Sequence, residues 1–377
     1  TEGPGSARSR GAPQTKAPHP VDPTLPGHYP PSPRRITTGA AVFRFRRAPL
    51  ISSSPLADLL FAFMSLSRRT FLKLSAAGLV GAVVIERAHD YFSESTARAR
   101  ILIVGGGAAG ITVAAHLTDR LRHPDITIIE PESIHHYQPG YTLIAAGLLA
   151  PQEITRPTAS LVPSGVKWLQ DRVVELNPDR NRLTTARTGV LAYDFLVLVP
   201  GCQLDFHLVE GITRETLGEG NAHCIYDLEG AQRCRDAIRR LPERKGGRLV
   251  FTDTYTKMKC GGAPKKVALL TEDRLRTQQR RGDFEFVYFQ NEKTLMKPKV
   301  YGDRLAAIYA ARGIKAHYLH RLAAIDTRAR RAVFHRLPEA STKPLPAGHA
   351  LEKIEVDFDF LHFMPPMAAP DFVRQST

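Results

Sequence analysis

The chain has 377 residues, 43% hydrophobic and 24% charged, with a formal net charge of +15. This composition allows two or three globular units with buried cores. The basic residues are scattered, are not interleaved with aromatic residues, and accompany no nucleic-acid-binding motif. This distribution argues against a nucleic-acid partner. The positive charge fits an anionic membrane surface or simple solubility.

The N-terminal residues are not expected to belong to the globular units. Residues 1 to about 55 are rich in Pro, Arg, Ser and Gly, contain few acids and show no hydrophobic periodicity. Such a composition cannot bury enough apolar area to offset chain entropy, so disorder is expected. Because the chain begins with Thr1 and its first methionine is Met64, residues 1–63 are interpreted as a disordered or spurious N-terminal extension.

An export signal is predicted at residues 64–99. Residues 67–73 read S-R-R-T-F-L-K, and an apolar stretch follows at 74–85. That stretch has the length of a signal h-region and is shorter than the ~20 residues that span a bilayer. The segment resembles a twin-arginine export signal, with A-R-A at 97–99 as its cleavage site. It predicts a protein on the periplasmic side of the cytoplasmic membrane. The alternative is a short amphipathic helix with two chance arginines.

A dinucleotide-binding motif opens the globular part. An apolar strand is expected at 100–104, and it is followed by G-G-G-A-A-G at 105–110 and a helical pattern through Leu121. A second strand at 125–129 runs into Glu130. In this pattern the glycines allow a tight turn and close backbone approach to a pyrophosphate, which the helix N-terminus stabilises, while the acid binds ribose hydroxyls. The motif alone does not distinguish FAD from NAD.

Later segments favour FAD. Residues 193–201 are expected to form a strand that runs into a glycine turn, and they resemble the motif that closes the first FAD segment in flavoproteins with two dinucleotide domains. Residues 171–176 resemble the strand whose backbone meets the adenine. The expected cofactor-binding residues are Gly105, Gly106, Gly107, Ala108, Ala109, Gly110, Glu130, Val173 and Gly201.

Cys260 is the main candidate for chemistry. It lies in K-C-G-G-A-P-K-K (259–266), between an expected strand at 248–252 and an expected helix at 267–276. The positive end of the helix dipole and the neighbouring lysines both favour thiolate, the reactive form of cysteine. The glycines leave room for another group to approach the backbone. A buried structural cysteine is the alternative.

Four segments carry a family resemblance: 134–140, 204–206, 259–266 and 360–367. Together they resemble the sulfide:quinone oxidoreductases, especially the branch with the mitochondrial enzymes, over residues 100–377. The resemblance implies a peripheral membrane flavoprotein that oxidises sulfide to a protein-bound persulfide and passes two electrons through FAD to quinone. It also implies that Cys260 is the flavin-proximal redox cysteine. Lys265 or Lys266 could stabilise negative charge there, or lie on a solvated helix face.

The resemblance also bears on the other cysteines. Cys224 coincides with an accessory cysteine found in many members and is the second candidate catalytic residue. Cys202 follows a glycine turn that is expected near the flavin, but the family pattern requires no thiol there. Cys234 is expected on a helix, in packing or at the surface. Plain disulfides are a further possibility for an exported protein.

The chain departs from the family pattern at its C-terminus. Family members continue well beyond the position of Thr377. The resemblance assigns to that part the partner cysteine, a Gly-Asp segment for FAD, much of the quinone pocket and the membrane-contacting helices. A fragment of a longer protein is therefore expected, and residues 100–377 alone are expected to bind FAD poorly. The alternative is a protein that no longer carries out the complete catalytic cycle of the family.

The sequence also bears on four other functions. A disulfide reductase is rejected because no cysteine lies between residues 100 and 201, and a type 2 NADH:quinone dehydrogenase lacks its second glycine motif near 248–262. The flavin subunit of a flavocytochrome sulfide dehydrogenase is closer, although no covalent-flavin cysteine stands near residues 137–139. A non-catalytic flavin-binding remnant remains an alternative.

The expected fold is α/β, with two Rossmann-like three-layer dinucleotide-binding domains and the C-terminal part missing. The FAD domain takes residues 100–210, the second domain 211–345, and residues 346–377 return to the FAD domain. Further expected elements are strands at 284–289 and 315–319 and a helix at 301–312. No metal site is expected.

Overall fold

The computed structural model describes residues 95–96, 98–338 and 351–376. The expected N-terminal extension lies outside these residues, and so does the expected export signal up to residue 94. None of the helices in the described ranges is long and apolar enough to cross a membrane.

The first sheet is parallel and has the strand order β5-β2-β1-β9. Its strands are β1 (Arg100–Val104), β2 (Asp125–Ile129), β5 (Lys167–Leu169) and β9 (Phe195–Leu198). Helix α3 (Ala108–Thr118) connects β1 to β2. Both strands occupy the residues predicted from their apolar runs, because a parallel strand covered on two faces needs continuous hydrophobic sequence.

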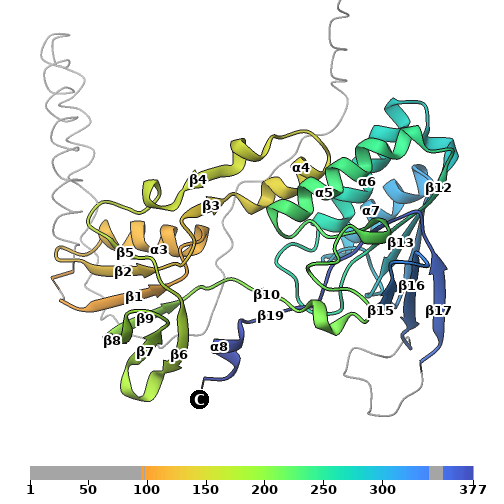
Figure 1. The fold of residues 1–377 in the computed structure, drawn as a ribbon. Coiled ribbons are helices and arrows are strands. Elements are labelled where there is room, and N and C mark those ends of the chain that lie inside the picture. The colour runs from red at the N-terminus through yellow and green to blue at the C-terminus, as the bar shows by residue number, and fades with distance from the viewer. Residues whose placement is uncertain (1–94, 97, 339–350, 377) are drawn as a thin grey trace, which may run out of the picture. The chain divides into compact units, whose positions relative to one another are not determined.

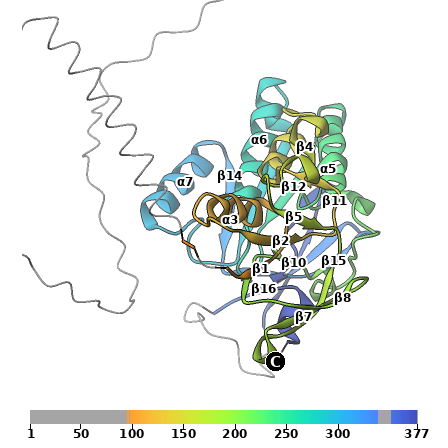
Figure 2. The same cartoon turned by 90° about the vertical axis from the view of Figure 1, so that its left-hand side faces the viewer.

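The two faces of β1 pack against different layers (Figures 1 and 2). Ile101 and Ile103 cluster with Ala114 of α3, whereas Leu102 and Val104 cluster with the antiparallel sheet β6-β7-β8. That sheet consists of β6 (Val173–Asn177), β7 (Arg182–Thr185) and β8 (Gly189–Ala192). The alternation follows from the two-residue period of a strand and gives this domain its three layers.

The second sheet is also parallel, with the order β11-β18-β12-β13-β14. Its strands are β11 (Ala222–His223), β12 (Gly247–Thr252), β13 (Phe284–Gln290), β14 (Ile314–Tyr318) and β18 (Phe360–His362). The core strands are almost fully buried, and their aromatic residues stack: the rings of Phe251 and Phe286 lie 5.7 Å apart. Two parallel sheets with intervening helices confirm the predicted α/β class.

The helices of this second unit are α5 (Leu228–Arg240), α6 (Ala263–Thr277) and α7 (Lys299–Ala311). Asp227 caps α5 by accepting a hydrogen bond from Gly230 N at 2.6 Å. Helix α6 begins four residues before its predicted start, so Pro264 lies in its first turn, where a missing N–H costs nothing.

Several smaller elements connect or cover the two sheets. They are β3 (Ile134–His136), α4 (Tyr141–Ala145), β4 (Thr155–Pro157), β10 (Gln203–Leu204), β15 (His320–Asp326), β16 (Arg331–Arg336), β17 (Lys353–Asp357), β19 (Met367–Ala368) and α8 (Asp371–Arg374). β3 pairs with β4, and β15, β16 and β17 form an antiparallel sheet.

The chain returns to the first domain later than expected. Residues 353–362 form β17 and β18, and β18 pairs in parallel with β11 and β12 inside the second sheet. The expected return at residue 346 is therefore wrong, because the buried edge of β12 needs a partner strand and 360–362 supplies it. The return is visible at β19, which pairs with β10, and at α8, where Phe372 and Val373 pack against the cluster that contains β6.

Candidate functional site

The glycine turn after β1 is packed too tightly for side chains at three positions, one of which is Gly106, where a Cβ would lie 2.6 Å from the Glu130 Cβ. Gly105 has φ +110°, and a Cβ there would lie 2.3 Å from the carbonyl oxygen of Val199. A Cβ on Gly110 would lie 1.9 Å from the carbonyl oxygen of Gly105. Gly105 and Gly110 are therefore needed for the fold itself, since they let β1, β9 and α3 approach one another.

Gly107 differs from these three glycines. It is the N-cap of α3, makes no side-chain cap, and has a φ of −73° that any residue adopts. A Cβ on Gly107 would meet nothing within 4 Å, and the neighbouring Ala108 and Ala109 are exposed. The first turn of α3 thus presents backbone N–H groups and the positive end of the helix dipole to open space, which suits a diphosphate.

Glu130 lies beside this turn, directly after β2. Its carboxylate accepts hydrogen bonds from Gly106 N at 2.7 Å and from Glu132 N at 2.9 Å. A carboxylate has about four acceptor sites, so capacity remains for a ribose hydroxyl. The acid and the glycine turn are together, as the motif requires.

The other two expected cofactor-binding residues occupy different settings. Val173 begins β6, and its side chain is buried in the cluster with Leu102 and Val104, so only its backbone is available to a ligand. Gly201 follows β9 with φ +79° and open space around its Cβ position. Their roles toward an adenine or a flavin stay predictions. We call the first turn of α3, which is open at Gly107, the cradle. The cradle and the carboxylate of Glu130 fit the diphosphate and ribose of FAD.

Asp171 has a structural role that the sequence did not reveal. The predicted strand at 171–176 begins only at Val173, and Asp171 is buried before it. Its carboxylate accepts hydrogen bonds from the backbone N–H groups of Arg172, Arg187 and Thr188 and from the Thr188 hydroxyl. Burial raises the pKa of Asp171, but these hydrogen bonds outweigh it and hold the pKa well below its ordinary value.

Cys260 lies in the loop from β12 to α6, three residues before the helix begins, and it is exposed. Its carbonyl oxygen accepts hydrogen bonds from the Tyr226 hydroxyl at 3.1 Å and from Ala263 N at 3.1 Å. Gly261 and Gly262 have open space at their Cβ positions. Two donors thus hold the carbonyl of Cys260, while the thiol remains accessible next to the N-terminal end of α6.

The lysines near Cys260 have separate partners. Lys259 Nζ donates to Gln138 Oε1 at 2.9 Å and lies 4.9 Å from the centre of the Tyr226 ring. Lys265 is buried and forms an ion pair with Asp253 at 2.9 Å. Lys265 is therefore neither on a solvated helix face nor free to stabilise the Cys260 thiolate. Lys266 is exposed.

The Asp253–Lys265 pair closes the loop that carries Cys260. Asp253 directly follows β12, and Lys265 lies in the first turn of α6. Asp253 also accepts from Asn291 N at 3.0 Å. Burial raises the pKa of Asp253 more than Lys265 and Asn291 lower it. Breaking such a buried pair costs ~3–5 kcal/mol, which gives the loop a rigid base.

The remaining thiols are less accessible. Cys224 is only 2% exposed, and burial raises its pKa to about 12. Cys234 is buried on α5, and Cys202 is half-buried with its sulfur 3.9 Å from the Met367 sulfur. All four cysteines are free. The participation of Cys224 stays a prediction, and burial stabilises its neutral thiol and opposes thiolate chemistry.

Tyr226 lies near three of the four cysteines, and the sequence reasoning missed it. It is buried, and its pKa is raised first by burial and then by the charges of Cys260, Cys224 and Cys202. The only feature of the local sequence that could have pointed to Tyr226 is its position two residues after Cys224. The hydroxyl's partner, Cys260 O, is 34 residues away in the chain, so no spacing rule could have found it.

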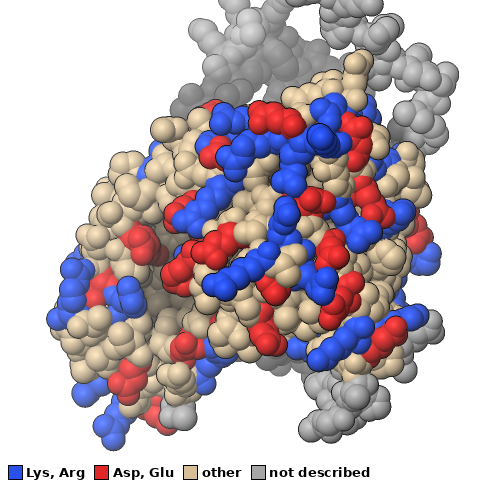
Figure 3. All heavy atoms as spheres, turned by 45° about the vertical axis from the view of Figure 1, so that its right-hand side comes forward, with Lys and Arg blue, Asp and Glu red and all other residues tan. Residues whose placement is uncertain are grey.

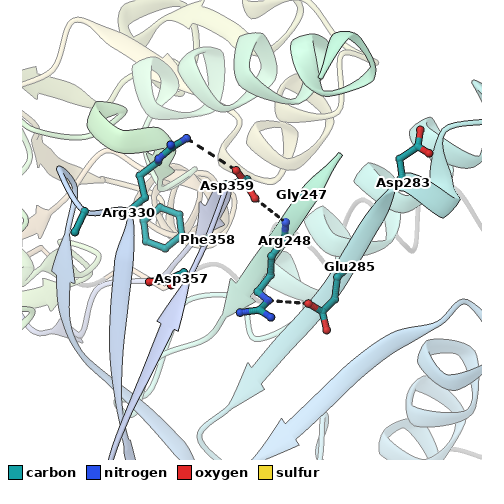
Figure 4. Close-up of a pocket in the computed structure, with 9 residues that line it drawn as sticks. Gly247, Arg248, Asp283, Glu285, Arg330, Asp357, Phe358 and Asp359 are labelled. Atoms are coloured by element: carbon teal, nitrogen blue, oxygen red, sulfur yellow. Dashed lines mark hydrogen bonds and ion pairs between the residues drawn. The ribbon is translucent and has the colours of Figure 1, made fainter. Parts of the chain in front are cut away.

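A cavity of 580 Å³ lies elsewhere, at the amino-terminal edge of the second sheet (Figure 4). Its charges are paired: Arg248 donates to Glu285 at 2.7 Å through its side chain and to Asp359 at 2.9 Å through its backbone N–H. Ligands of open α/β sheets bind at the carboxyl ends of strands, where Cys260 lies. We therefore assign this cavity to the ion-pair network of the sheet edge.

Comparisons with known proteins agree with this arrangement. The family model for pyridine nucleotide-disulphide oxidoreductases matches residues 99–250. The mitochondrial sulfide:quinone oxidoreductase of Mus musculus is 33% identical over 280 residues, which cover 73% of this chain and 58% of the mouse protein. The mitochondrial sulfide:quinone oxidoreductase of Schizosaccharomyces pombe is 30% identical over 296 residues, which cover 74% of this chain and 61% of that protein. The chain thus spans about three fifths of the length of these relatives.

Solved structures show the same fold. The sulfide:quinone oxidoreductase from Aquifex aeolicus superposes with a TM-score of 0.60 at 21% identity, covering 74% of this chain and 61% of that one. NDH2 from Plasmodium falciparum, solved in complex with NADH, gives a TM-score of 0.55 at 13% identity and covers 74% of this chain and 57% of that one. Glycine turn, cysteine loop and relatives lead to one assignment: the chain belongs to the sulfide:quinone oxidoreductase family, within the pyridine nucleotide-disulphide oxidoreductase superfamily.

Proposed function

We propose that this protein acts in FAD-dependent oxidation of sulfide, with Cys260 as its redox cysteine and a quinone as electron acceptor. The observation that carries the proposal is the exposed Cys260 thiol beside the start of α6, on a loop whose base is fixed by Tyr226 and by the Asp253–Lys265 pair. The mouse and S. pombe relatives are sulfide:quinone oxidoreductases by name, which supports these substrates.

FAD would be held by the first domain. The N-terminal turn of α3, open at Gly107, would bind its diphosphate, and Glu130 would accept from a ribose hydroxyl. Bound FAD would supply a two-electron relay between a cysteine thiolate and the quinone. Gly105 and Gly110 contribute only indirectly, because they hold the turn in shape.

Cys260 supplies the leaving group. In the oxidised protein it shares a disulfide with a second cysteine. Hydrosulfide attacks the sulfur of that second cysteine, the S–S bond to Cys260 breaks, and a new S–S bond makes the second cysteine a persulfide. Cys260 leaves as thiolate with the electron pair, and the N-terminus of α6 stabilises that charge.

The cycle closes with balanced electrons. A nucleophilic acceptor removes the outer sulfur of the persulfide, and the two thiols re-form their disulfide. Two electrons and two protons then convert the quinone to quinol. The protein's contribution is to expose the Cys260 sulfur while its backbone carbonyl is held by Tyr226 and Ala263, so the thiol keeps one position through the cycle.

The test is a sulfide-dependent quinone reduction, with FAD added, by this sequence extended to the full length of its relatives. We expect reduction of a soluble ubiquinone analogue, and a loss of at least about 100-fold in Cys260→Ser, since the serine hydroxyl cannot form a disulfide. Cys234→Ser is the matched control because Cys234 is buried on α5 away from the loop. Undiminished activity in Cys260→Ser, or no sulfide-dependent reduction by the wild type, contradicts the proposal. Electron delivery to cytochrome but not to quinone would instead favour the flavocytochrome class.

A further inference from the structure

A basic groove lies between the loop after α4 and the helices α5 and α6, remote in sequence from the glycine turn. It has a volume of 470 Å³ and is lined by Ala146, Gly147, Leu148, Leu149, Ala150, Arg235, Ile238, Arg239 and Arg274. This volume lies within the ~300–1,000 Å³ range of small-molecule sites. Three of the lining residues are arginines, and none is acidic.

The arginines converge from two helices. Arg235 and Arg239 are four residues apart on α5, so they share one face of that helix, and Arg274 comes from the last turn of α6. Arg235 Nε bonds Asp236 at 3.0 Å. Among the residues that the structure describes, Arg239 and Arg274 form no ion pair, and the buried Nε of Arg274 has no hydrogen-bond partner.

An unpaired buried donor is costly, and an arginine cluster in which only Arg235 has an acidic partner is self-repelling. Both penalties are removed by an anion that accepts several N–H groups. The guanidinium fork matches the oxygen geometry of a phosphate group. The groove also has an apolar side: Ile238 is buried in its wall, and Leu148 is 62% exposed at the loop.

We propose that this groove is a binding site for a phosphate group, carried either by a soluble phosphate compound or by the headgroup of an anionic phospholipid. Arg239 and Arg274 bind the phosphate oxygens, and Leu148 contacts an apolar part of the ligand. The site is independent of the FAD cradle at α3 and of Cys260, so it stands whether or not the proposed redox function holds.

The experiment measures binding by the full chain without added FAD and again with FAD, so that competition by FAD at the α3 cradle is seen directly. One arm titrates inorganic pyrophosphate by calorimetry. The other sediments phosphatidylcholine vesicles with and without phosphatidylglycerol. We expect binding in at least one arm, and the double variant Arg239→Gln/Arg274→Gln to weaken it at least about tenfold. The arm that responds identifies the source of the phosphate.

The matched control is Arg180→Gln/Arg182→Gln, two exposed arginines at the turn between β6 and β7. It removes the same net charge, so a general electrostatic attraction would fall equally in both variants. We expect the control to stay within about twofold of the wild type. Equal weakening in both double variants, or no binding by the wild type in either arm, overturns the proposal.

Discussion

At the scale of single residues, burial separates cysteines that look alike in the sequence. Cys260 and Cys224 were both candidates for chemistry in the sequence. In the structure Cys260 is exposed, whereas Cys224 is buried with its pKa raised to about 12. Thiolate, not thiol, is the nucleophile, so burial makes Cys224 the less reactive and the less accessible of the two.

Alkylation of the native protein checks this difference. With iodoacetamide at neutral pH, we expect Cys260 to label first, Cys202 more slowly, and Cys224 and Cys234 only after the protein opens. Peptide mass spectrometry over a time course measures the order, and labelling in urea serves as the control for intrinsic reactivity. Labelling of Cys224 at the rate of Cys260 would show that the β11 end is open in solution.

A second prediction at this scale concerns Asp171, whose pKa is held low in the folded protein. A carboxyl group of depressed pKa stabilises the fold fully above its unfolded pKa of ~3.9. This contribution is lost as pH falls further, toward the folded pKa, because protonation then removes an acceptor of the β7–β8 turn. We expect the Tm to decline below about pH 4, and Asp171→Asn to lower it at neutral pH and flatten that decline. Asp179→Asn, at an exposed acid, is the control; a parallel acid decline in Asp171→Asn contradicts the assignment.

At the scale of elements, one glycine turn combines two different requirements. Gly105 and Gly110 are needed so that β9 and α3 can approach β1. Gly107 faces open space and has ordinary backbone angles, so the fold does not require it. A position that is glycine without a structural need indicates that something else must approach the backbone there.

This distinction predicts opposite outcomes for two matched substitutions. Gly107→Ala is expected to leave the Tm of the apoprotein within a few degrees and to weaken FAD binding about tenfold or more, because the new methyl group fills the approach to the helix N-terminus. Gly110→Ala is expected to destabilise the apoprotein, since its Cβ would overlap the Gly105 carbonyl. Thermal melts and FAD fluorescence titration measure both. Unchanged FAD affinity in Gly107→Ala would show that FAD does not bind at the N-terminus of α3.

At the scale of the whole molecule, the chemistry-bearing loops come from the carboxyl ends of strands in two parallel sheets, β1 and β2 in one and β12 in the other. Figure 3 shows a face on which acidic and basic side chains alternate. Several basic residues form ion pairs across strands, such as Lys315 with Glu285 and Arg331 with Asp357. Pairing of this kind opposes a single-sign electrostatic field.

The sequence by itself determined the elements whose signal is local. Continuous apolar runs predicted β1, β2, β12 and β13 to within a residue, and the glycine spacing predicted the turn into α3. It also placed Cys260 before α6. These features depend on residues that are close together in the sequence, so the hydrophobic period of a strand or helix predicts them directly.

Only the tertiary structure decided the rest. β18 joins the second sheet because the buried edge of β12, more than a hundred residues earlier, needs a partner strand. The sequence of residues 360–362 does not show that β12 is this partner. The same holds for Lys265, which is buried against Asp253, and for Tyr226, whose hydroxyl fixes Cys260. Burial and long-range hydrogen bonds depend on which segments meet, and that choice is made by the packing of the whole chain rather than by any local pattern.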